Sequence, residues 1–169
     1  IDPSAIALVG HSFGGYEADL IISQTDRFAT AVSGSGWTDL VSSYLFINSG
    51  FKKPEYFRAE DDQIRIGKSL YEDPQSYLQN SPVLLAASIK TPLLGWTGKE
   101  DPTVHPLQSM EFYMALRRLN KTHTLLVYPE EGHFLLKKEN QKDLSERIQQ
   151  WFDCYLKNGR IQPWMKSDN

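Results

Sequence analysis

Three residues of this chain have the types and the order needed for nucleophilic catalysis: Ser12, Asp101 and His133. A serine hydroxyl is a poor nucleophile at neutral pH, so it needs a histidine to remove its proton as general base. A carboxylate then fixes the tautomer of that histidine and stabilises the imidazolium that forms. The order Ser, Asp, His therefore predicts acyl transfer through a serine nucleophile.

Ser12 lies in a glycine-rich turn between an expected strand and an expected helix. The apolar run 5–9 predicts a buried parallel strand, and residues 16–22 predict a helix. A G-x-S-x-G match between a strand and a helix is typical of a nucleophile elbow, in which the serine backbone is strained. Gly10 and Gly14 supply the small neighbours that such a turn requires. We therefore predict that the serine hydroxyl projects from the end of the sheet.

The helix that follows the serine also supplies a group for the oxyanion. The backbone N–H of Phe13, the residue after the nucleophile, is the predicted first oxyanion-hole donor. The first N–H groups of a helix have no intrahelical acceptor, and the positive end of the helix dipole favours an anion there. His11 lies inside the turn, and we interpret it as a packing or hydrogen-bonding residue rather than as the base.

Asp101 and His133 each follow an expected strand. The run 124–128 is apolar and leads into a Pro/Gly loop that carries His133, while the strand before Asp101 ends in a glycine turn. Pro102 disfavours a helical conformation at Asp101. Together with the serine, both residues then lie at the C-terminal edge of a parallel sheet, where open α/β sheets place their sites. Two alternatives stay open: Glu100 as the acid, and His133 as an ordinary loop histidine.

The remaining histidines and the cysteine receive no catalytic role. We interpret His105 as a helix-start residue and His123 as a loop residue. Cys154 is the single cysteine, so no internal disulfide can form, and its place on an amphipathic helix predicts a buried structural thiol.

Several stretches of the chain resemble the prolyl oligopeptidase (S9) family of serine peptidases, in the C-terminal part of their α/β-hydrolase domain. The resemblance covers nearly the whole chain and rests on the following residues: Gly10-His11-Ser12-Phe13-Gly14-Gly15-Tyr16, Ser81-Pro82, Gly98-Lys99-Glu100-Asp101-Pro102-Thr103-Val104, Gln108-Ser109 and Glu131-Gly132-His133. It implies that Ser12, Asp101 and His133 form the catalytic triad of a peptidase acting on short peptides, with no metal or organic cofactor. Thr97 stands where many members have a histidine, which weakens assignment to a subfamily.

The resemblance also implies a fold, and it indicates how much of the catalytic domain this chain contains. We expect a three-layer α/β-hydrolase-type parallel sheet with helices on both faces. Because the elbow strand begins near residue 5, we expect 1–169 to be the C-terminal portion of a catalytic domain whose N-terminal half lies outside this chain. The second oxyanion donor then cannot be assigned. A first strand left at the sheet edge predicts self-association through that edge.

The least regular stretch, residues 37–87, follows an expected strand at 28–33 and predicts a cap-like excursion over the site. Trp37, Tyr44 and Phe46 are candidates for an apolar substrate pocket. The alternative, which we favour, is that these aromatic residues form the small core of the excursion.

The last third of the chain is expected to be scaffold. One helix should pack on the sheet through residues at helical spacing: Leu107, Met110, Tyr113, Met114 and Leu116. A closing helix repeats the pattern, and we expect Gly159 to terminate it. Two alternatives stay open for the tail, which either packs against the body or is disordered.

The amino-acid composition excludes few classes of function. The 169 residues suit one domain, and 18 basic against 21 acidic residues give a net charge of −3, so nothing indicates a nucleic-acid or anionic membrane partner. No apolar run approaches the roughly 20 residues that span a bilayer. One cysteine does not fix the compartment. Two other functions stay open: an esterase or thioesterase of the same fold, and a catalytically silent interaction module.

Overall fold

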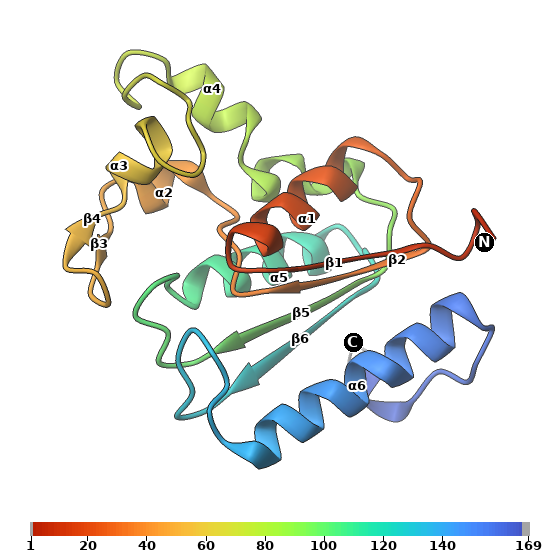
Figure 1. The fold of residues 1–169 in the computed structure, drawn as a ribbon. Coiled ribbons are helices and arrows are strands. Elements are labelled where there is room, and N and C mark those ends of the chain that lie inside the picture. Colours follow the sequence, from red (N-terminus) through yellow and green to blue (C-terminus); the bar gives the residue numbers. More distant parts are fainter. Residues whose placement is uncertain (1, 167–169) are drawn as a thin grey trace.

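The computed structural model describes residues 2–166, and its centre is a four-stranded parallel sheet (Figure 1). The strand order is β1-β2-β5-β6, with every neighbouring pair parallel. The strands are β1 (Ala7–His11), β2 (Thr30–Gly34), β5 (Leu93–Gly98) and β6 (His123–Tyr128). All four therefore end at the same edge of the sheet.

Helices cover both faces of this sheet (Figure 1). On one face lie α1 (Phe13–Gln24), the 3₁₀ helix η1 (Pro82–Ser88) and α5 (Leu107–Arg118). The other face carries α6 (Lys138–Leu156), which is followed by a short 3₁₀ turn, η2 (Pro163–Met165). This arrangement confirms the predicted three-layer α/β fold.

Each face of the sheet has its own apolar core, because successive strand residues point to opposite sides. Ala31 of β2 packs in the cluster beneath α1 and α5, whereas its neighbour Val32 packs in the cluster beneath α6. Trp151 of α6 is completely buried in that second cluster, and its Nε1–H donates to Thr30 Oγ1 at 2.5 Å. The closing helix is thus fixed to the sheet by both packing and a hydrogen bond.

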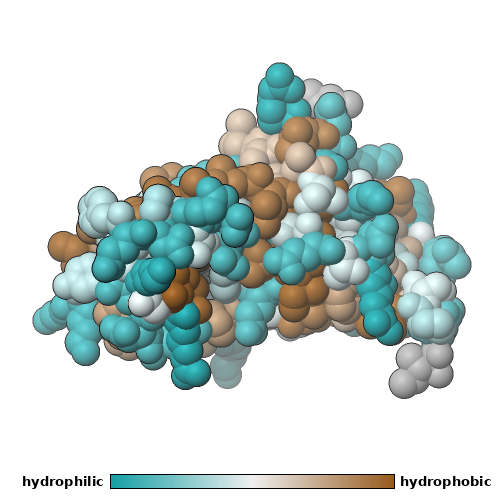
Figure 2. Space-filling view, turned by 90° about the horizontal axis from the view of Figure 1, so that it is seen from above, coloured by the Kyte–Doolittle hydropathy of each residue, from teal (hydrophilic) through white to brown (hydrophobic). Residues whose placement is uncertain are grey.

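Residues 37–87 leave the sheet between β2 and β5; most of them form a lobe beside it, and η1 at their end packs on α1 and α5 (Figure 1). This excursion contains α2 (Leu40–Tyr44), β3 (Ile47–Asn48), β4 (Lys53–Pro54), α3 (Tyr56–Glu60) and α4 (Pro74–Gln79), followed by η1. Figure 2, which looks down on the molecule from above, shows brown apolar surface among the polar residues. Within the excursion the exposed large apolar side chains are Leu45, Ile47, Phe51, Tyr56, Tyr71, Leu78 and Leu84.

The first two strands differ in position from the sequence prediction. β1 runs from residue 7 to 11 rather than 5 to 9, because its ladder with β2 continues through Gly10 and His11. β2 likewise runs from 30 to 34 rather than 28 to 33. β1 is also not fully buried, since it lies at the sheet edge and Val9 is 59% exposed.

His123 was wrongly predicted to lie in a loop. It is the first residue of β6, pairs with Leu93 of β5 and is only 7% exposed. The α5 prediction was also partly wrong, because Leu107 and Met114 are exposed. The buried face of α5 consists instead of residues at i, i+4 spacing: Gln108, Phe112 and Leu116.

The end of α6 differs from the prediction as well. Asn158, not Gly159, adopts the left-handed conformation after the helix, with φ 55°. Gly159 donates its N–H to the Asp153 carbonyl at 2.8 Å, an approach that a Cβ would obstruct. Cys154 is half-buried rather than buried. Beyond the helix the tail packs back, and Trp164 Nε1–H donates to Gln150 Oε1 at 2.7 Å.

Candidate active site

Ser12 forms the turn between β1 and α1 in a backbone conformation that non-glycine residues rarely adopt. Its φ is 59° and its ψ is −121°, and its N–H donates to the Gly34 carbonyl at 2.8 Å. A Cβ on Gly10 would lie 1.8 Å from the Gly14 carbonyl oxygen, so only glycine fits there. A Cβ on Gly14 would meet nothing within 4 Å, so the smallness expected of that position is not required by the described residues. A Cβ on Gly15 would lie 2.6 Å from the Gly34 carbonyl oxygen, so the turn is held by the strand pairing and by Gly10 and Gly15.

The structure brings Ser12, His133 and Asp101 into one hydrogen-bonded chain. His133 Nε2 lies 2.8 Å from Ser12 Oγ, and His133 Nδ1 lies 2.8 Å from Asp101 Oδ2. Because an ionised carboxylate only accepts, the Nδ1–H donates to Asp101 and Nε2 accepts from the serine hydroxyl. This tautomer is the one that lets the histidine remove the serine proton.

The Asp101 carboxylate is completely buried and fixed on both oxygens. Its side chain has no exposed surface, while that of His133 is 10% exposed. Oδ1 accepts the backbone N–H of Thr103 at 2.8 Å and of Val104 at 3.0 Å, which leaves Oδ2 directed at the histidine. The neighbouring Glu100 makes no such contact with His133, so the geometry favours Asp101 over Glu100 as the acid.

A second carboxylate, Glu131, shapes the loop that carries the histidine. It is only 2% exposed and accepts the backbone N–H groups of Leu136 at 2.7 Å and Lys137 at 3.0 Å. Asn140 Nδ2 donates to it at 2.7 Å. The Leu136 N–H is the largest influence on Glu131 and lowers the pKa of its carboxyl. This role was not predicted from the sequence, in which Glu131 appears only as part of the family-like stretch Glu131-Gly132-His133.

His11 braces the same loop from the elbow side. Its Nε2–H donates to the backbone carbonyl of His133 at 2.8 Å. Its ring stacks on Trp96, with centroids 5.0 Å apart and planes only 2° from parallel. Burial lowers the pKa of His11. These contacts confirm the prediction that His11 packs and forms a hydrogen bond rather than acting as the base.

The other sequence candidates lie at separate places. The N–H of Phe13 belongs to the first residue of α1, beside the serine. Trp37 and Phe46 line a cavity next to α5, but Tyr44 does not. Tyr44 is buried in the core of the excursion, and its hydroxyl donates to Glu60. Trp37 belongs to the same core and also lines the cavity, so only Tyr44 is purely a core residue of the excursion.

His105 is the remaining histidine that received a prediction from the sequence. His105 Nδ1 accepts the Leu107 N–H at 3.2 Å, as expected for a residue at the start of a helix. Among residues 2–166, no three His, Cys, Asp or Glu side chains gather in a way that could hold a metal ion. A search of the same residues finds no helix with the length and apolar character of a membrane span.

The parallel sheet, the strained elbow and the Ser–His–Asp chain define a protein of the α/β-hydrolase fold. The sequence model of the prolyl oligopeptidase family matches residues 1–159, so the chain belongs to that family. It is 27% identical over 159 residues to an uncharacterized peptidase, YuxL, of Bacillus subtilis, and 29% identical over 165 residues to dipeptidyl peptidase family member 6 of Caenorhabditis elegans. These alignments cover 92% and 95% of this chain, but only 23% and 22% of the relatives.

Solved structures likewise match most of this chain with a small part of a larger peptidase. A puromycin-hydrolyzing peptidase of Mycobacterium tuberculosis superimposes with a TM-score of 0.81 at 29% identity. The match covers 92% of this chain and 22% of that one. The chain therefore spans about a fifth to a quarter of the length of the proteins that it matches.

Proposed function

We propose that this chain carries the catalytic triad of a serine peptidase that hydrolyses peptide bonds in short peptides. The observation that carries the proposal is the hydrogen-bonded chain from Ser12 Oγ through His133 to the buried Asp101, with both distances at 2.8 Å. Family membership and relatives named as peptidases support it.

The reaction would begin with attack of Ser12 Oγ on the carbonyl carbon of the scissile bond. His133 Nε2 takes the hydroxyl proton, and the imidazolium is stabilised by Asp101. The carbonyl oxygen becomes an oxyanion, to which the Phe13 N–H donates at the positive end of α1. His133 then gives its proton to the leaving amine as the C–N bond breaks, which leaves an acyl ester on Ser12. Water, deprotonated by His133, hydrolyses this ester and restores the free serine.

We also propose that residues 1–169 act as the C-terminal portion of a larger catalytic domain, with 37–87 as the excursion beside its site. The edge position of β1 and the exposed Val9 support a further proposal, self-association of the isolated chain through that strand. Light scattering tests it: we expect oligomers whose proportion rises with concentration. A monodisperse monomer at all concentrations would contradict this proposal.

The proposed activity is tested by labelling the chain with a fluorophosphonate and mapping the adduct by mass spectrometry. We expect one adduct on Ser12, and none in Ser12→Ala. A panel of peptidyl nitroanilides and acyl esters then separates a peptidase from an esterase or thioesterase. A folded chain that is not labelled at Ser12 would contradict the proposal and leave the silent interaction module as the better reading.

A further inference from the structure

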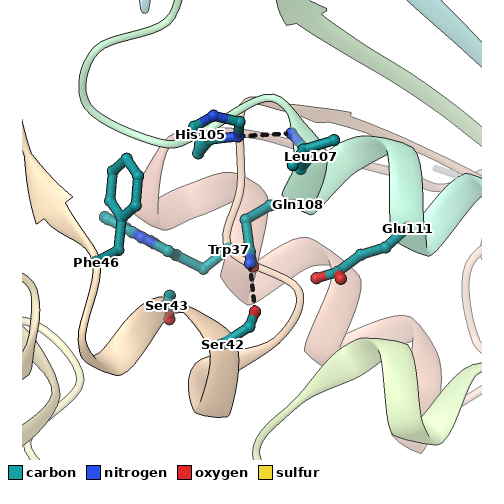
Figure 3. A pocket seen from close by; sticks show the side chains of 8 residues that line it. All are labelled: Trp37, Ser42, Ser43, Phe46, His105, Leu107, Gln108 and Glu111. Atoms are coloured by element: carbon teal, nitrogen blue, oxygen red, sulfur yellow. Dashed lines mark hydrogen bonds between the residues drawn. The ribbon is translucent and has the colours of Figure 1, made fainter.

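A cavity of about 360 Å³ lies between α2 and the start of α5, and none of the three residues of the triad lines it. Figure 3 shows its side chains: the rings of Trp37, Phe46 and His105 gather at one side, and Glu111 reaches in from α5 at the other. Phe46 and His105 are in edge-to-face contact, with centroids 5.4 Å apart. The volume falls in the lower part of the range for small-molecule sites, about 300–1,000 Å³.

Most polar groups around this cavity already have partners. Gln108 Oε1 accepts the backbone N–H groups of Thr38 and Asp39, each at 2.8 Å. Its Nε2–H donates to Ser42 Oγ at 2.9 Å, which is the dashed line between Gln108 and Ser42 in Figure 3. The Gln108 amide therefore holds α2 against α5 and has no acceptor left for a ligand.

Glu111 is the exception. Its Oε1 is buried and has no hydrogen-bond partner among residues 2–166. Burial, and to a smaller extent the nearby Asp39 carboxylate, raise the pKa of Glu111 to about 7. Asp39 itself caps α2 by accepting the N–H groups of Val41 and Ser42 at 2.9 and 3.2 Å, so its position is fixed.

A buried carboxylate oxygen without a donor is costly, and a second carboxylate nearby makes its ionised form costlier still. A cation that donates to Glu111 would remove both penalties at once, because it supplies a hydrogen bond and offsets the charge. An anion would be repelled. A neutral donor would satisfy the oxygen but leave the charge uncompensated.

We propose that this cavity binds an amphipathic cation, an ammonium group on a flat apolar body, with the ammonium on Glu111 and the body against Trp37 and Phe46. The two rings provide an apolar wall whose faces also attract cations. None of these residues belongs to the triad, but Trp37 and Phe46 are also the candidates named above for the substrate pocket. The ammonium could be a free amine or the N-terminus of a peptide, since both present the same group.

Calorimetric titration of the full chain tests the proposal with four probes. Phenethylamine and phenylalanine amide carry the ammonium; N-acetylphenethylamine and N-acetylphenylalanine amide are their uncharged counterparts. We expect saturable binding of the charged probes and at least about tenfold weaker binding of the uncharged ones, which corresponds to about 1.4 kcal/mol. Tighter binding of phenylalanine amide than of phenethylamine would identify a peptide N-terminus as the source, and the reverse order a free amine.

Variants locate the site. Glu111→Gln keeps the shape of the side chain and removes its charge, so we expect at least about tenfold weaker binding of the charged probes. Phe46→Ala removes one of the two rings of the apolar wall and should weaken binding of the charged probes even though Glu111 is intact. Glu146→Gln neutralises an exposed glutamate of α6 and is the matched control, with binding unchanged. Thermal melting of each variant establishes that it is folded. Equal binding of charged and uncharged probes, unchanged binding by folded Glu111→Gln, or no saturable binding at all would overturn the proposal.

Discussion

His123 provides a test of how strongly burial without partners affects the stability of this fold. It begins β6 and is only 7% exposed, and neither ring nitrogen has a hydrogen-bond partner among residues 2–166. Its ring lies beside those of Phe112 and Tyr113, with centroids 6.2 and 5.4 Å away. This burial lowers the pKa of His123 from 6.5 to about 3. The folded state thus keeps the ring neutral where the unfolded chain would protonate it.

The sign of the effect on stability follows from proton uptake. Below pH 6.5 the unfolded chain binds a proton that the folded chain does not bind, so stability falls as the pH is lowered. Each pH unit in this range costs about 1.4 kcal/mol. Between pH 8 and pH 5 the loss due to His123 is therefore about 2 kcal/mol. The loss would be complete only near pH 3, where the folded chain also protonates.

The substitution His123→Leu isolates this effect. Leucine has a similar volume and no polar atoms, and a small space beside the ring can accommodate the change of shape. We expect the variant to be at least as stable at pH 8, since two unpartnered polar atoms are removed. Its advantage should grow by about 2 kcal/mol between pH 8 and pH 5. Urea unfolding followed by circular dichroism at several pH values measures the difference.

Other buried groups also titrate, so the informative quantity is the difference in the free energy of unfolding between the variant and its parent. Burial raises the pKa of Asp19 from 3.8 to about 8, which makes stability fall as pH rises through that range. Asp19 lines the same small cavity as His123, so the comparison is made with Asp19→Asn in both proteins, which removes this titration. His105→Gln controls for the loss of a histidine as such. A difference between His123→Leu and the parent that stays constant from pH 8 to pH 5 would refute the reasoning.

Two further predictions concern the elbow and the histidine loop. Gly10→Ala should cost about 3 kcal/mol and abolish fluorophosphonate labelling, because its Cβ would meet the Gly14 carbonyl at 1.8 Å. Gly14→Ala is its control and should melt at or above the parent temperature; equal melting of the two variants would contradict the elbow geometry. His11→Leu should remain folded but be labelled about tenfold more slowly, since the His133 carbonyl loses its donor. An unchanged labelling rate would show that His11 does not position His133.

The sequence predicts where the triad residues lie better than it predicts which residues hold them in place. The reason is physical. Parallel strands end at one edge, so a motif, a carboxylate and a histidine that each follow a strand must lie near one another. The role of Glu131 depends instead on backbone N–H groups five and six residues later, whose direction only the folded loop determines. The burial of His123 likewise arises from its pairing with Leu93, thirty positions earlier in the chain. Neither the spacing nor the residue type shows these contacts in advance.

The aromatic residues of the excursion illustrate a second limit. Trp37 and Tyr44 are both buried aromatic residues after β2, yet only Trp37 also faces the cavity. The difference depends on helix α2, which directs Tyr44 toward Tyr77 in an edge-to-face contact at 5.3 Å. A hydrophobic pattern predicts that such side chains are removed from water, but it does not predict which of them line a cavity.

The excursion also bears on the geometry of the triad. Asn48 of β3 donates to the Thr103 carbonyl at 3.0 Å, and the Gly50 N–H donates to the Pro102 carbonyl at 3.2 Å. Both acceptors lie in the loop whose N–H groups fix the Asp101 carboxylate. The hairpin of β3 and β4 therefore braces the loop that holds the Asp101 carboxylate. Because the hydrogen bond from His133 needs the carboxylate in one orientation, an excursion that moved as a free lid would disturb that orientation. This coupling favours an excursion that stays docked on the acid loop while substrate enters elsewhere.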